Sequence, residues 1–598
     1  MSTSQAPYPS RLNPALREIR LLHLHPGPPE SPIRCHLTTA SLLSSPTYEA
    51  LSYVWGDPSN PPTIILHGSP FPVTRNLYTA LRYLRRESQE RILWIDALVI
   101  NQADVEERNS QVSMMDAVYS SASAVSIWLG EEEEGSDDAF DVLLEIAEGR
   151  LVDAERQIET LKFFFRIVER PWFTRMWIMQ ELALARVDPQ VGCGYKWLSW
   201  NRLMETWRTL RQTGFTHEYI GLPERRWKKR AKDEEHEDVV VMKLKFDTLD
   251  DMRQAVYKQG GEILNKLILI SKSSLATEPR DRIYALLGMM KEEDREAIAV
   301  DYRKPVPVVY AEAMAHIFEK GQGPFFLSGM FLQGIPSPPG WPSWVPDFAA
   351  QCATSRYNSK QISGDWFHPR HGDGVSGPGA DADNGRVLDD MKTLKVEGMF
   401  VDVVDEVLLF EQTIDGCLQQ LPQVEFLADQ AKSRVPRDLT LRDYFSKFKC
   451  KESLWQTLVM NRRQGYAKPE IAPQSFENMY EFIRGRCELP PEFEREGSEC
   501  AEDYVQEYKS NLSNILPKCV FFTTESGFVG LGMPGIQKGD HVTIWFGAPV
   551  PFIIRPITSK EGFYNLIGVA YVAGIMDGEM VDEIYCEDLT DAQTFFIL

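Results

Sequence analysis

The sequence lacks the signals of export and membrane insertion. Its first residues, MSTSQAPYPSRLNP, contain no apolar signal core. Apolar runs such as LNKLILI and IGVAYVAGIM are too short to span a bilayer. The nine cysteines are scattered, odd in number and without a CxxC pair. We therefore expect reduced thiols in the cytosol or the nucleus, no membrane span and no zinc site.

Positive charge is also scarce. The 64 basic side chains are outnumbered by 86 acidic ones, which gives a net charge of −22. A surface that follows phosphates needs positive charge, so nucleic acid is not an expected partner. Binding of nucleic acid by a local basic patch remains the alternative.

Common motifs of nucleotide binding and catalysis are missing as well. The sequence has no GxGxxG after a strand, no GxxxxGK[ST], no HExxH and no GxSxG. Its ten histidines are scattered, and none has diagnostic spacing to a cysteine or serine. These absences weaken the kinase, NTPase, hydrolase and metalloprotease interpretations, and we expect no metal and no bound cofactor.

Strand-like and helix-like segments alternate up to about residue 200. YEALSYVW, RILWIDAL and AVSIWLG have the pattern of buried strands, and VTRNLYTALRYLRRES repeats apolar residues at a helical period. This alternation predicts an α/β domain over residues 1–200, with a mostly parallel sheet covered by helices on both faces. Ligands of such folds bind at the carboxyl ends of the strands.

The remaining sequence predicts three further regions, in keeping with the three or four domains that the length suggests. Residues 201–335 look helical. Residues 336–515 are mixed and contain a Gly/Pro-rich loop, HPRHGDGVSGPGADADNG. Residues 516–598 carry short β-type runs broken by glycine and proline, which predict a small antiparallel β-barrel or sandwich.

Polar and aromatic side chains gather where the first predicted strands end. Ser52, Tyr53 and Trp55 follow the first buried run, and Asp96 ends the second. Arg108 lies on the next predicted helix. Parallel strands would bring these side chains to one rim, where they could bind a substrate. The residues alone leave the structural alternatives open, since Asp96 also suits a cap, Arg108 an ion pair and Trp55 a core position.

The segment RPWFTRMWIMQELALA carries the sharpest candidate. It places Trp177 and Glu181 four residues apart, on one face of a predicted helix that also carries Leu184 and Ala185. A carboxylate on an apolar face is either a core residue with a buried partner or a working group in a cleft. Composition alone favours the core interpretation, for Trp177 as well.

Three ordered blocks resemble a known family. YEALSYVWGD, the long run from WIDALVINQ to SIWLG, and RPWFTRMWIMQE resemble the HET (heterokaryon incompatibility) domain of filamentous fungi, over roughly residues 48–185. Val99 stands where that family often has cysteine. The HET domain in turn is similar to the TIR domain, which implies a flavodoxin-like, TIR-like parallel sheet.

The resemblance also implies a function. It implies a cytoplasmic effector of fungal non-self recognition and innate immunity that promotes programmed cell death. The WIMQEL segment is similar to the TIR segment in which tryptophan precedes the catalytic glutamate by four residues. By this likeness Glu181 is the catalytic carboxylate and NAD is the substrate, cleaved at the nicotinamide–ribose bond. A homo-oligomer in the active state and an unknown protein trigger or allelic partner are implied in the same way.

The chemistry agrees with a single carboxylate. Loss of nicotinamide leaves an oxocarbenium-like ribosyl centre, which Glu181 could stabilise. Tyr53 or Trp55 could stack on a base, and Arg75 or Arg108 could meet the pyrophosphate. The alternatives are a non-enzymatic signalling module, in which Glu181 only stabilises its helix, and an enzyme that acts on another nucleotide or nucleoside.

Overall fold

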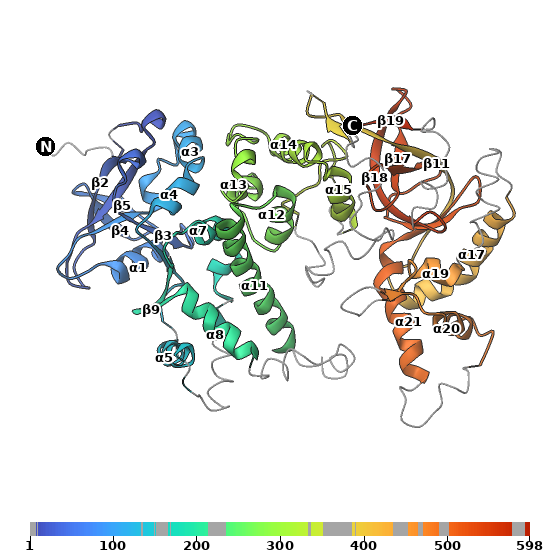
Figure 1. Ribbon diagram of the computed structural model, residues 1–598, viewed down its shortest axis with the longest axis horizontal. Helices are drawn as coiled ribbons and strands as arrows, with labels where there is room; N and C mark the ends of the chain where they lie inside the picture. The colour runs from blue at the N-terminus through green and yellow to red at the C-terminus, as the bar shows by residue number, and fades with distance from the viewer. Residues whose placement is uncertain are drawn as a thin grey trace. The chain divides into compact units, whose positions relative to one another are not determined.

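The computed structural model divides the chain into two compact units, Met1–Val309 and Tyr310–Leu598 (Figure 1). Each unit contains a large β-sheet of its own. The structure describes residues 7–8, 10–132, 136–148, 150, 166–167, 169–212, 235–332, 337–350, 385–388, 390–434, 453–463, 470–488, 501–576 and 592–598. The predicted Gly/Pro-rich loop falls on residues 368–385, and all of it except Gly385 lies outside the described residues.

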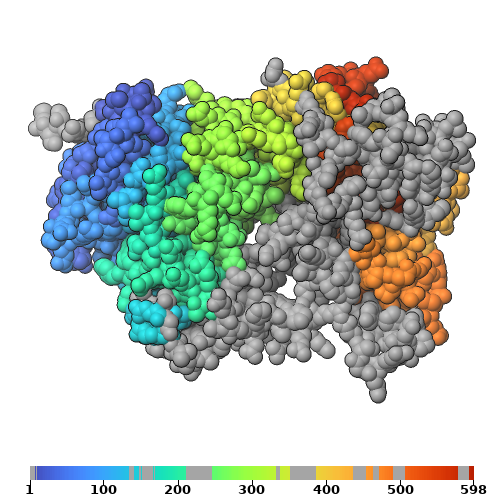
Figure 2. Space-filling model, viewed as in Figure 1, coloured from blue at the N-terminus to red at the C-terminus, as the bar shows by residue number. Residues whose placement is uncertain are grey.

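A nine-stranded mixed sheet organises the first unit, in the order β5-β4-β2-β1-β6-β3-β7-β8-β9. On the face shown in Figure 2, residues of the first part of this unit, coloured in shades of blue, form one continuous surface. The strands are β1 Glu18–Leu24, β2 Arg34–Ser41, β3 Glu49–Tyr53, β4 Thr63–Leu66, β5 Ser69–Pro72, β6 Arg91–Trp94, β7 Ala124–Trp128, β8 Gln190–Cys193 and β9 Lys196–Ser199.

Most of the parallel pairing lies at the centre of this sheet. β3 pairs in parallel with β6 on one side and with β7 on the other, and β7 pairs in parallel with β8. β1 joins β6, and β9 joins β8, in antiparallel fashion. The α/β prediction is therefore confirmed, but the sheet is mixed, and the expectation of a parallel sheet holds mainly for its centre. The chain leaves β3 for β6 and returns to β7, so the strand order reverses beside β3.

Local sequence explains the central elements. In β3 and β7 every residue after the first is buried, as expected of central strands that are covered on both faces. The first helix, α1 (Arg75–Leu84), buries Leu77, Ala80, Leu81 and Leu84, which repeat at helical spacing. The Thr74 side chain accepts a hydrogen bond from the Leu77 amide and so caps this helix.

Helices make up the rest of the first unit (Figure 1). Every helix or strand that the structure describes between residues 201 and 332 is in fact helical, either an α-helix or a short 3-10 turn. The α-helices after α1 are α2 Asp96–Val99, α3 Val105–Val112, α4 Met115–Ser121, α5 Ser136–Ala147, α7 Ile178–Ala183, α8 Trp200–Gln212, α11 Glu235–Gln259, α12 Leu264–Ser271 and α13 Asp281–Leu287. Two more follow at the boundary and beyond it, α14 Val306–Glu319 and α15 Gly323–Leu332.

The second unit is built around a closed β-barrel. The long strand β11 (Leu394–Leu409) pairs along its length with β19, β16 and β14. From β14 the pairing continues through β15, β18 and β17 to β16, which returns to β11 and closes the ring. These strands are β14 Val520–Thr524, β15 Val529–Gly532, β16 His541–Trp545, β17 Phe552–Pro556, β18 Phe563–Val572 and β19 Gln593–Ile597.

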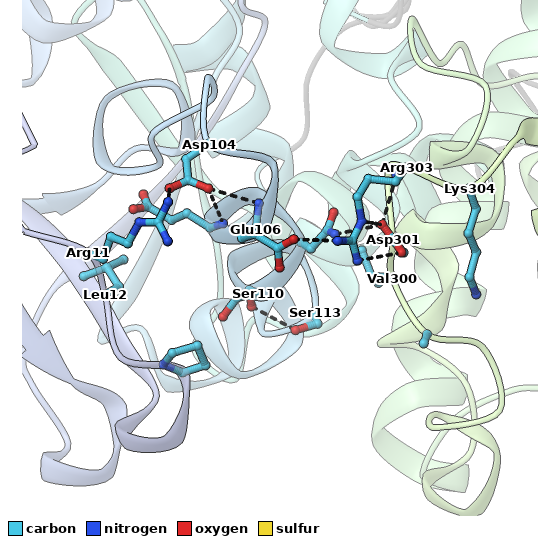
Figure 3. A pocket seen from close by; sticks show the side chains of 14 residues that line it. Arg11, Leu12, Asp104, Glu106, Ser110, Ser113, Val300, Asp301, Arg303 and Lys304 are labelled. Atoms are coloured by element: carbon cyan, nitrogen blue, oxygen red, sulfur yellow. Dashed lines mark hydrogen bonds and ion pairs between the residues drawn. The ribbon is translucent and has the colours of Figure 1, made fainter.

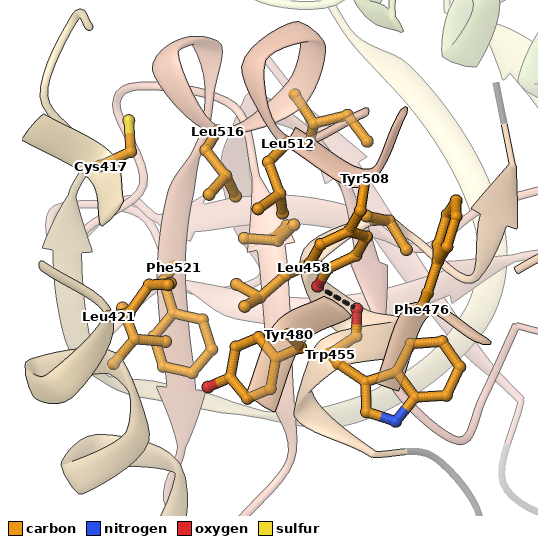
Figure 4. Close-up of a cluster of buried hydrophobic side chains, with 14 of the residues drawn as sticks. Cys417, Leu421, Trp455, Leu458, Phe476, Tyr480, Tyr508, Leu512, Leu516 and Phe521 are labelled. Atoms are coloured by element: carbon orange, nitrogen blue, oxygen red, sulfur yellow. Dashed lines mark hydrogen bonds between the residues drawn. The ribbon is translucent and has the colours of Figure 1, made fainter. Parts of the chain in front are cut away.

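The β-rich carboxyl-terminal region is thus confirmed, and its shape is the barrel alternative. Sequence reasoning missed β11, which lies in the region described as mixed. Helices α17 Ile414–Lys432, α19 Leu454–Leu458, α20 Ser475–Ile483 and α21 Ala501–Ile515 share a buried cluster with the barrel. In Figure 4, Leu421, Leu458 and Tyr508 of these helices lie with Phe521 of β14. Within the described residues, no helix combines the length and the apolar character that crossing a membrane requires.

Candidate functional site

The Glu181 carboxylate is buried and has partners on two sides. The residue lies on α7 and is 1% exposed. The Ser52 hydroxyl donates a short hydrogen bond to Glu181 Oε2. Arg175 Nη1 lies 3.3 Å from Oε2 and Arg175 Nη2 lies 3.4 Å from Oε1. The carboxylate is therefore held by one hydroxyl and one guanidinium, which offset the cost of burying its charge.

Strand β3 positions Ser52 at the point where the sheet order reverses. Ser52 is the last residue but one of β3, is fully buried and lies opposite Ile127 of β7. Its hydroxyl oxygen accepts a 2.7 Å hydrogen bond from the Trp172 indole Nε1. Ser52 therefore links the indole to the carboxylate, at the carboxyl end of a central strand.

A 3-10 turn, Pro171–Thr174, supplies the other partners of the site. Its first residue is proline, whose fixed φ suits the start of a helical turn. The turn places Trp172 beside Ser52, and Arg175, at its end, beside Glu181. Sequence reasoning missed both residues, although they belong to the RPWFTR segment. Arg175 and Glu181 are six residues apart, so the helical spacing rule that selected Trp177 did not apply to them.

Asp96 couples electrostatically to the same site. It begins α2, which one residue separates from β6, and its carboxylate accepts hydrogen bonds from the Ala97 amide at 2.7 Å and from the Trp55 indole at 2.8 Å. The pKa of Asp96 is raised to about 6. Burial is the main cause, Arg175 acts against it by lowering the pKa, and the charge of Glu181 adds to the rise. Burial also opposes the charge of Arg175, but the two carboxylates outweigh it and raise the pKa of the guanidinium.

Two buried polar groups, one beside these charges and one next to Glu181 in the sequence, have no hydrogen-bond partner among the described residues. They are the Tyr53 hydroxyl and the Gln180 Oε1 atom. Burial raises the pKa of Tyr53, and the negative charges of Asp96 and Glu181 raise it too. An unpaired buried polar atom is costly, so these groups are the ones that a ligand or a rearrangement would satisfy.

Trp177 and Arg108 make their contacts in a neighbouring cluster around Asp281. Trp177 Nε1 donates to Asp281 Oδ2 at 2.9 Å, and the Tyr302 hydroxyl donates to Oδ1 at 2.6 Å. The Arg108 guanidinium lies over the Tyr302 ring, 4.0 Å from its centre. Burial raises the pKa of Asp281 to about 6, although both hydrogen bonds lower it. Helix α13, which begins at Asp281, thus holds the Trp177 side chain.

The structure therefore divides the predicted residues between two clusters. One cluster contains Ser52, Tyr53, Trp55, Asp96 and Glu181. Hydrogen bonds and electrostatic interactions in it connect residues at the carboxyl end of β3 with the carboxylates of Asp96 and Glu181. The other contains Arg108 and Trp177. Trp55 is 42% exposed, so the first cluster reaches the surface through its indole ring.

A pocket of about 530 Å³ lies elsewhere in the first unit (Figure 3). Five of its charged side chains pair with one another: Arg11 with Asp104 at 3.2 Å, and Arg303 with Glu106 at 2.6 Å and with Asp301 at 2.9 Å. None of the predicted site residues lines this pocket. Its mutually paired charges do not indicate a ligand.

Comparison with known proteins identifies the amino-terminal segment. Residues 48–181 match the family model described as heterokaryon incompatibility protein (HET), from the residue before β3 to Glu181 itself. The chain therefore contains a segment that matches the HET domain. The HET domain thus includes β3, β6 and β7 with their strand-end residues, whereas β1 and β2 precede the matched segment.

Two further comparisons extend beyond the HET domain. Residues 496–590 match the Het-6 beta-barrel domain, which includes strands β14 to β18. The chain is similar to heterokaryon incompatibility protein 6, OR allele, of Neurospora crassa, with 25% identity over 670 residues and 95% of each chain covered. No solved structure matches the chain.

Proposed function

We propose that this HET-domain protein is a cytoplasmic effector of fungal non-self recognition that promotes programmed cell death. The HET match and the full-length likeness to heterokaryon incompatibility protein 6 support this role. In this proposal a protein trigger or allelic partner starts the response, and the active form is a homo-oligomer.

The proposed activity of the HET domain is hydrolysis of NAD. One observation carries it: the Glu181 carboxylate meets Ser52 at the carboxyl end of β3, beside the reversal of strand order. Open α/β sheets bind their ligands at this position. Counted along the chain, the parallel centre β6-β3-β7-β8 has the order 2-1-3-4, which supports a flavodoxin-like, TIR-like core.

The reaction assigned to Glu181 is cleavage of the bond between nicotinamide and ribose. Nicotinamide leaves as a neutral molecule with the bonding electrons, and the ribosyl centre becomes positively charged. The carboxylate stabilises that charge until water adds, which gives ADP-ribose and one proton. The Ser52 hydrogen bond fixes the carboxylate, and the Tyr53 hydroxyl and the Trp55 ring are the groups assigned to substrate contact.

Substrate entry requires a rearrangement in this proposal. Glu181 is 1% exposed, and Arg175 already provides the positive charge that the ribosyl centre would bring. The 3-10 turn that carries Trp172 and Arg175 must therefore move before NAD reaches the carboxylate. Self-association is the event proposed to drive this movement.

The test measures nicotinamide release from NAD by purified full-length protein, with and without a crowding agent that favours association. We expect release by the wild type, and a rate at least about 100-fold lower for Glu181→Gln. The matched control is Glu106→Gln, because Glu106 is exposed and forms a surface pair with Arg303. No release under crowding would count against the activity, and equal release by both glutamate variants would remove Glu181 from it.

The second candidate is a signalling module without catalysis. The observation in its favour is the same burial, because a carboxylate bound by Ser52 and Arg175 also serves as a structural element. Toxicity on expression separates the two candidates. Toxicity that persists in a stably folded Glu181→Gln variant supports the signalling module, and toxicity lost with nicotinamide release supports the enzyme.

A further inference from the structure

Three histidines and one glutamate converge on the amino-terminal sheet, away from Glu181. His23 lies on β1, His25 follows that strand directly, His36 lies on β2 and Glu90 directly precedes β6. His23 and His36 are opposite one another in the antiparallel ladder, and β1 also pairs with β6. Side chains two residues apart on a strand point to the same face, so the sheet register brings the four groups together.

The ligand atoms of three of these residues already lie close to one another. His25 Nε2 is 2.8 Å from His36 Nδ1 and 3.9 Å from Glu90 Oε1. All three ligand atoms lie within 4.8 Å of one another. Two nitrogens bound to a tetrahedral zinc ion are about 3.3 Å apart. If the two rings moved apart by roughly 0.5 Å, their nitrogens would reach this distance, and coordination of a metal ion would replace the hydrogen bond.

His23 holds the glutamate in position for this role. Its Nδ1 donates to Glu90 Oε2 at 2.9 Å, and its Nε2 lies 2.9 Å from the Thr38 hydroxyl. Its ring stacks on the His36 ring, with the centres 4.5 Å apart. One carboxylate oxygen is therefore occupied, and Oε1 remains on the side of His25. Hydrogen bonds of this kind orient ligands in protein metal sites.

We propose that His25, His36 and Glu90 bind one zinc ion, or a transition-metal ion of similar chemistry. Two imidazoles and one carboxylate suit zinc, whereas magnesium and calcium require oxygen ligands. The side chains of His25 and Glu90 are 42% and 41% exposed, so the ion enters from solvent and keeps water in its fourth position. The ion links the end of β1 and the first part of β2 to the loop before β6.

This site departs from the sequence expectation of no metal. Positions 25, 36 and 90 have no diagnostic spacing, because the register of three strands creates the site. Two of the three ligands also precede the segment that matches the HET family model.

The test titrates zinc into chelator-treated full-length protein by calorimetry at pH 7.5. We expect the wild type to bind one more equivalent than His36→Ala or His25→Ala, and Glu90→Gln to bind that equivalent at least about 100-fold more weakly. His23→Gln should weaken binding about 10-fold, as for the loss of an orienting hydrogen bond. The matched control is Glu87→Gln, which removes one exposed carboxylate from the same loop. Equal stoichiometry and affinity in the wild type and His36→Ala would refute the site.

Thermal unfolding gives a second measurement that does not depend on counting zinc ions. Zinc should raise the midpoint of the wild type and of Glu87→Gln, but not that of His36→Ala, because an ion bound only to the native state stabilises it. Magnesium at the same concentration should change none of them. Circular dichroism without metal verifies the fold of each variant. An equal zinc-induced shift in the wild type and His36→Ala would also refute the proposal.

Discussion

Arg175 contacts both carboxylate oxygens of Glu181, with separations of 3.3 and 3.4 Å, and both side chains are largely buried. A buried ion pair contributes little net stability compared with apolar residues of the same size. Removal of one of the two side chains is costly, because the remaining charge stays buried without a partner. The pair therefore makes the described conformation depend on Arg175 staying in place.

Replacement of Arg175 by methionine should destabilise the HET domain by about 3–5 kcal/mol, because Glu181 then stays buried without its cation. Urea unfolding measures the change. The control is Arg82→Met, since Arg82 forms an exposed 3.8 Å pair with Glu30 that should contribute less than about 1 kcal/mol. The double variant Arg175→Met with Glu181→Leu should recover part of the loss. Equal effects of the two single arginine variants would contradict the dependence on Arg175.

Ser52→Ala should cost about 1–3 kcal/mol, because it removes the hydroxyl that links the Trp172 indole to the Glu181 carboxylate. The near-ultraviolet circular dichroism of the buried tryptophan should change as well. Ser120→Ala is the control, since that hydroxyl donates to a carbonyl of its own helix. A loss no larger than that of the control would mean that the link contributes nothing.

Asp96 should make the protein less stable as the pH rises from 5 to 7.5. Burial raises its pKa to about 6 in the folded state, above the usual 3.8, so the native protein binds the proton more tightly than the unfolded chain does. Stability is therefore lost as the pH rises from about 4 to about 6 and stays level above that, and the part of the loss that falls between pH 5 and 7.5 is roughly 1 kcal/mol, after allowance for solvent near the carboxyl group.

The measurement for Asp96 compares unfolding free energies at pH 5.0 and 7.5. Asp96→Asn should gain stability relative to the wild type as the pH rises, because the amide does not ionise. Asp57→Asn is the control, since a hydrogen bond from Ser59 lowers the pKa of Asp57 and leaves it charged at both pH values. A constant difference between the wild type and Asp96→Asn would disprove the raised pKa.

Trp177→Phe should destabilise the first unit by about 1 kcal/mol, since it removes the indole donor to Asp281 while keeping most of the ring. Asp281→Ala should cost more, because it also leaves the Tyr302 hydroxyl and the Trp177 indole without their acceptor. Chemical unfolding measures the free energy of unfolding of both variants and shows which loss is larger. A larger loss of stability for Trp177→Phe than for Asp281→Ala would show that packing of the Trp177 ring, and not its hydrogen bond to Asp281, stabilises this contact.

The central strands were predictable because their sequences record their burial. β3 and β7 are apolar runs that glycine or charge terminates, so local pattern was enough to place them beside helices. β11 was not predictable in the same way. One long strand pairs with β19, β16 and β14 in turn, and no short window of its sequence shows these three neighbours.

The candidate site was predictable in part. Ser52, Asp96 and Glu181 follow from the ends of strands and from the spacing of one helix. Arg175 did not follow, because a 3-10 turn and not helical periodicity brings it to Glu181. Trp177 was selected for its spacing, yet its indole donates to Asp281, a residue more than a hundred positions away.

The sequence by itself determined the α/β character of the HET domain, its central strands and the placement of one carboxylate on an apolar helix face. These features depend on periodicity over a few residues, which side-chain burial imposes locally. Only the tertiary structure decided that Glu181 is paired with Arg175 and Ser52, that the barrel closes through β11, and that His25, His36 and Glu90 meet. Such contacts join residues distant along the chain, and sheet register, which no short segment encodes, brings many of them together.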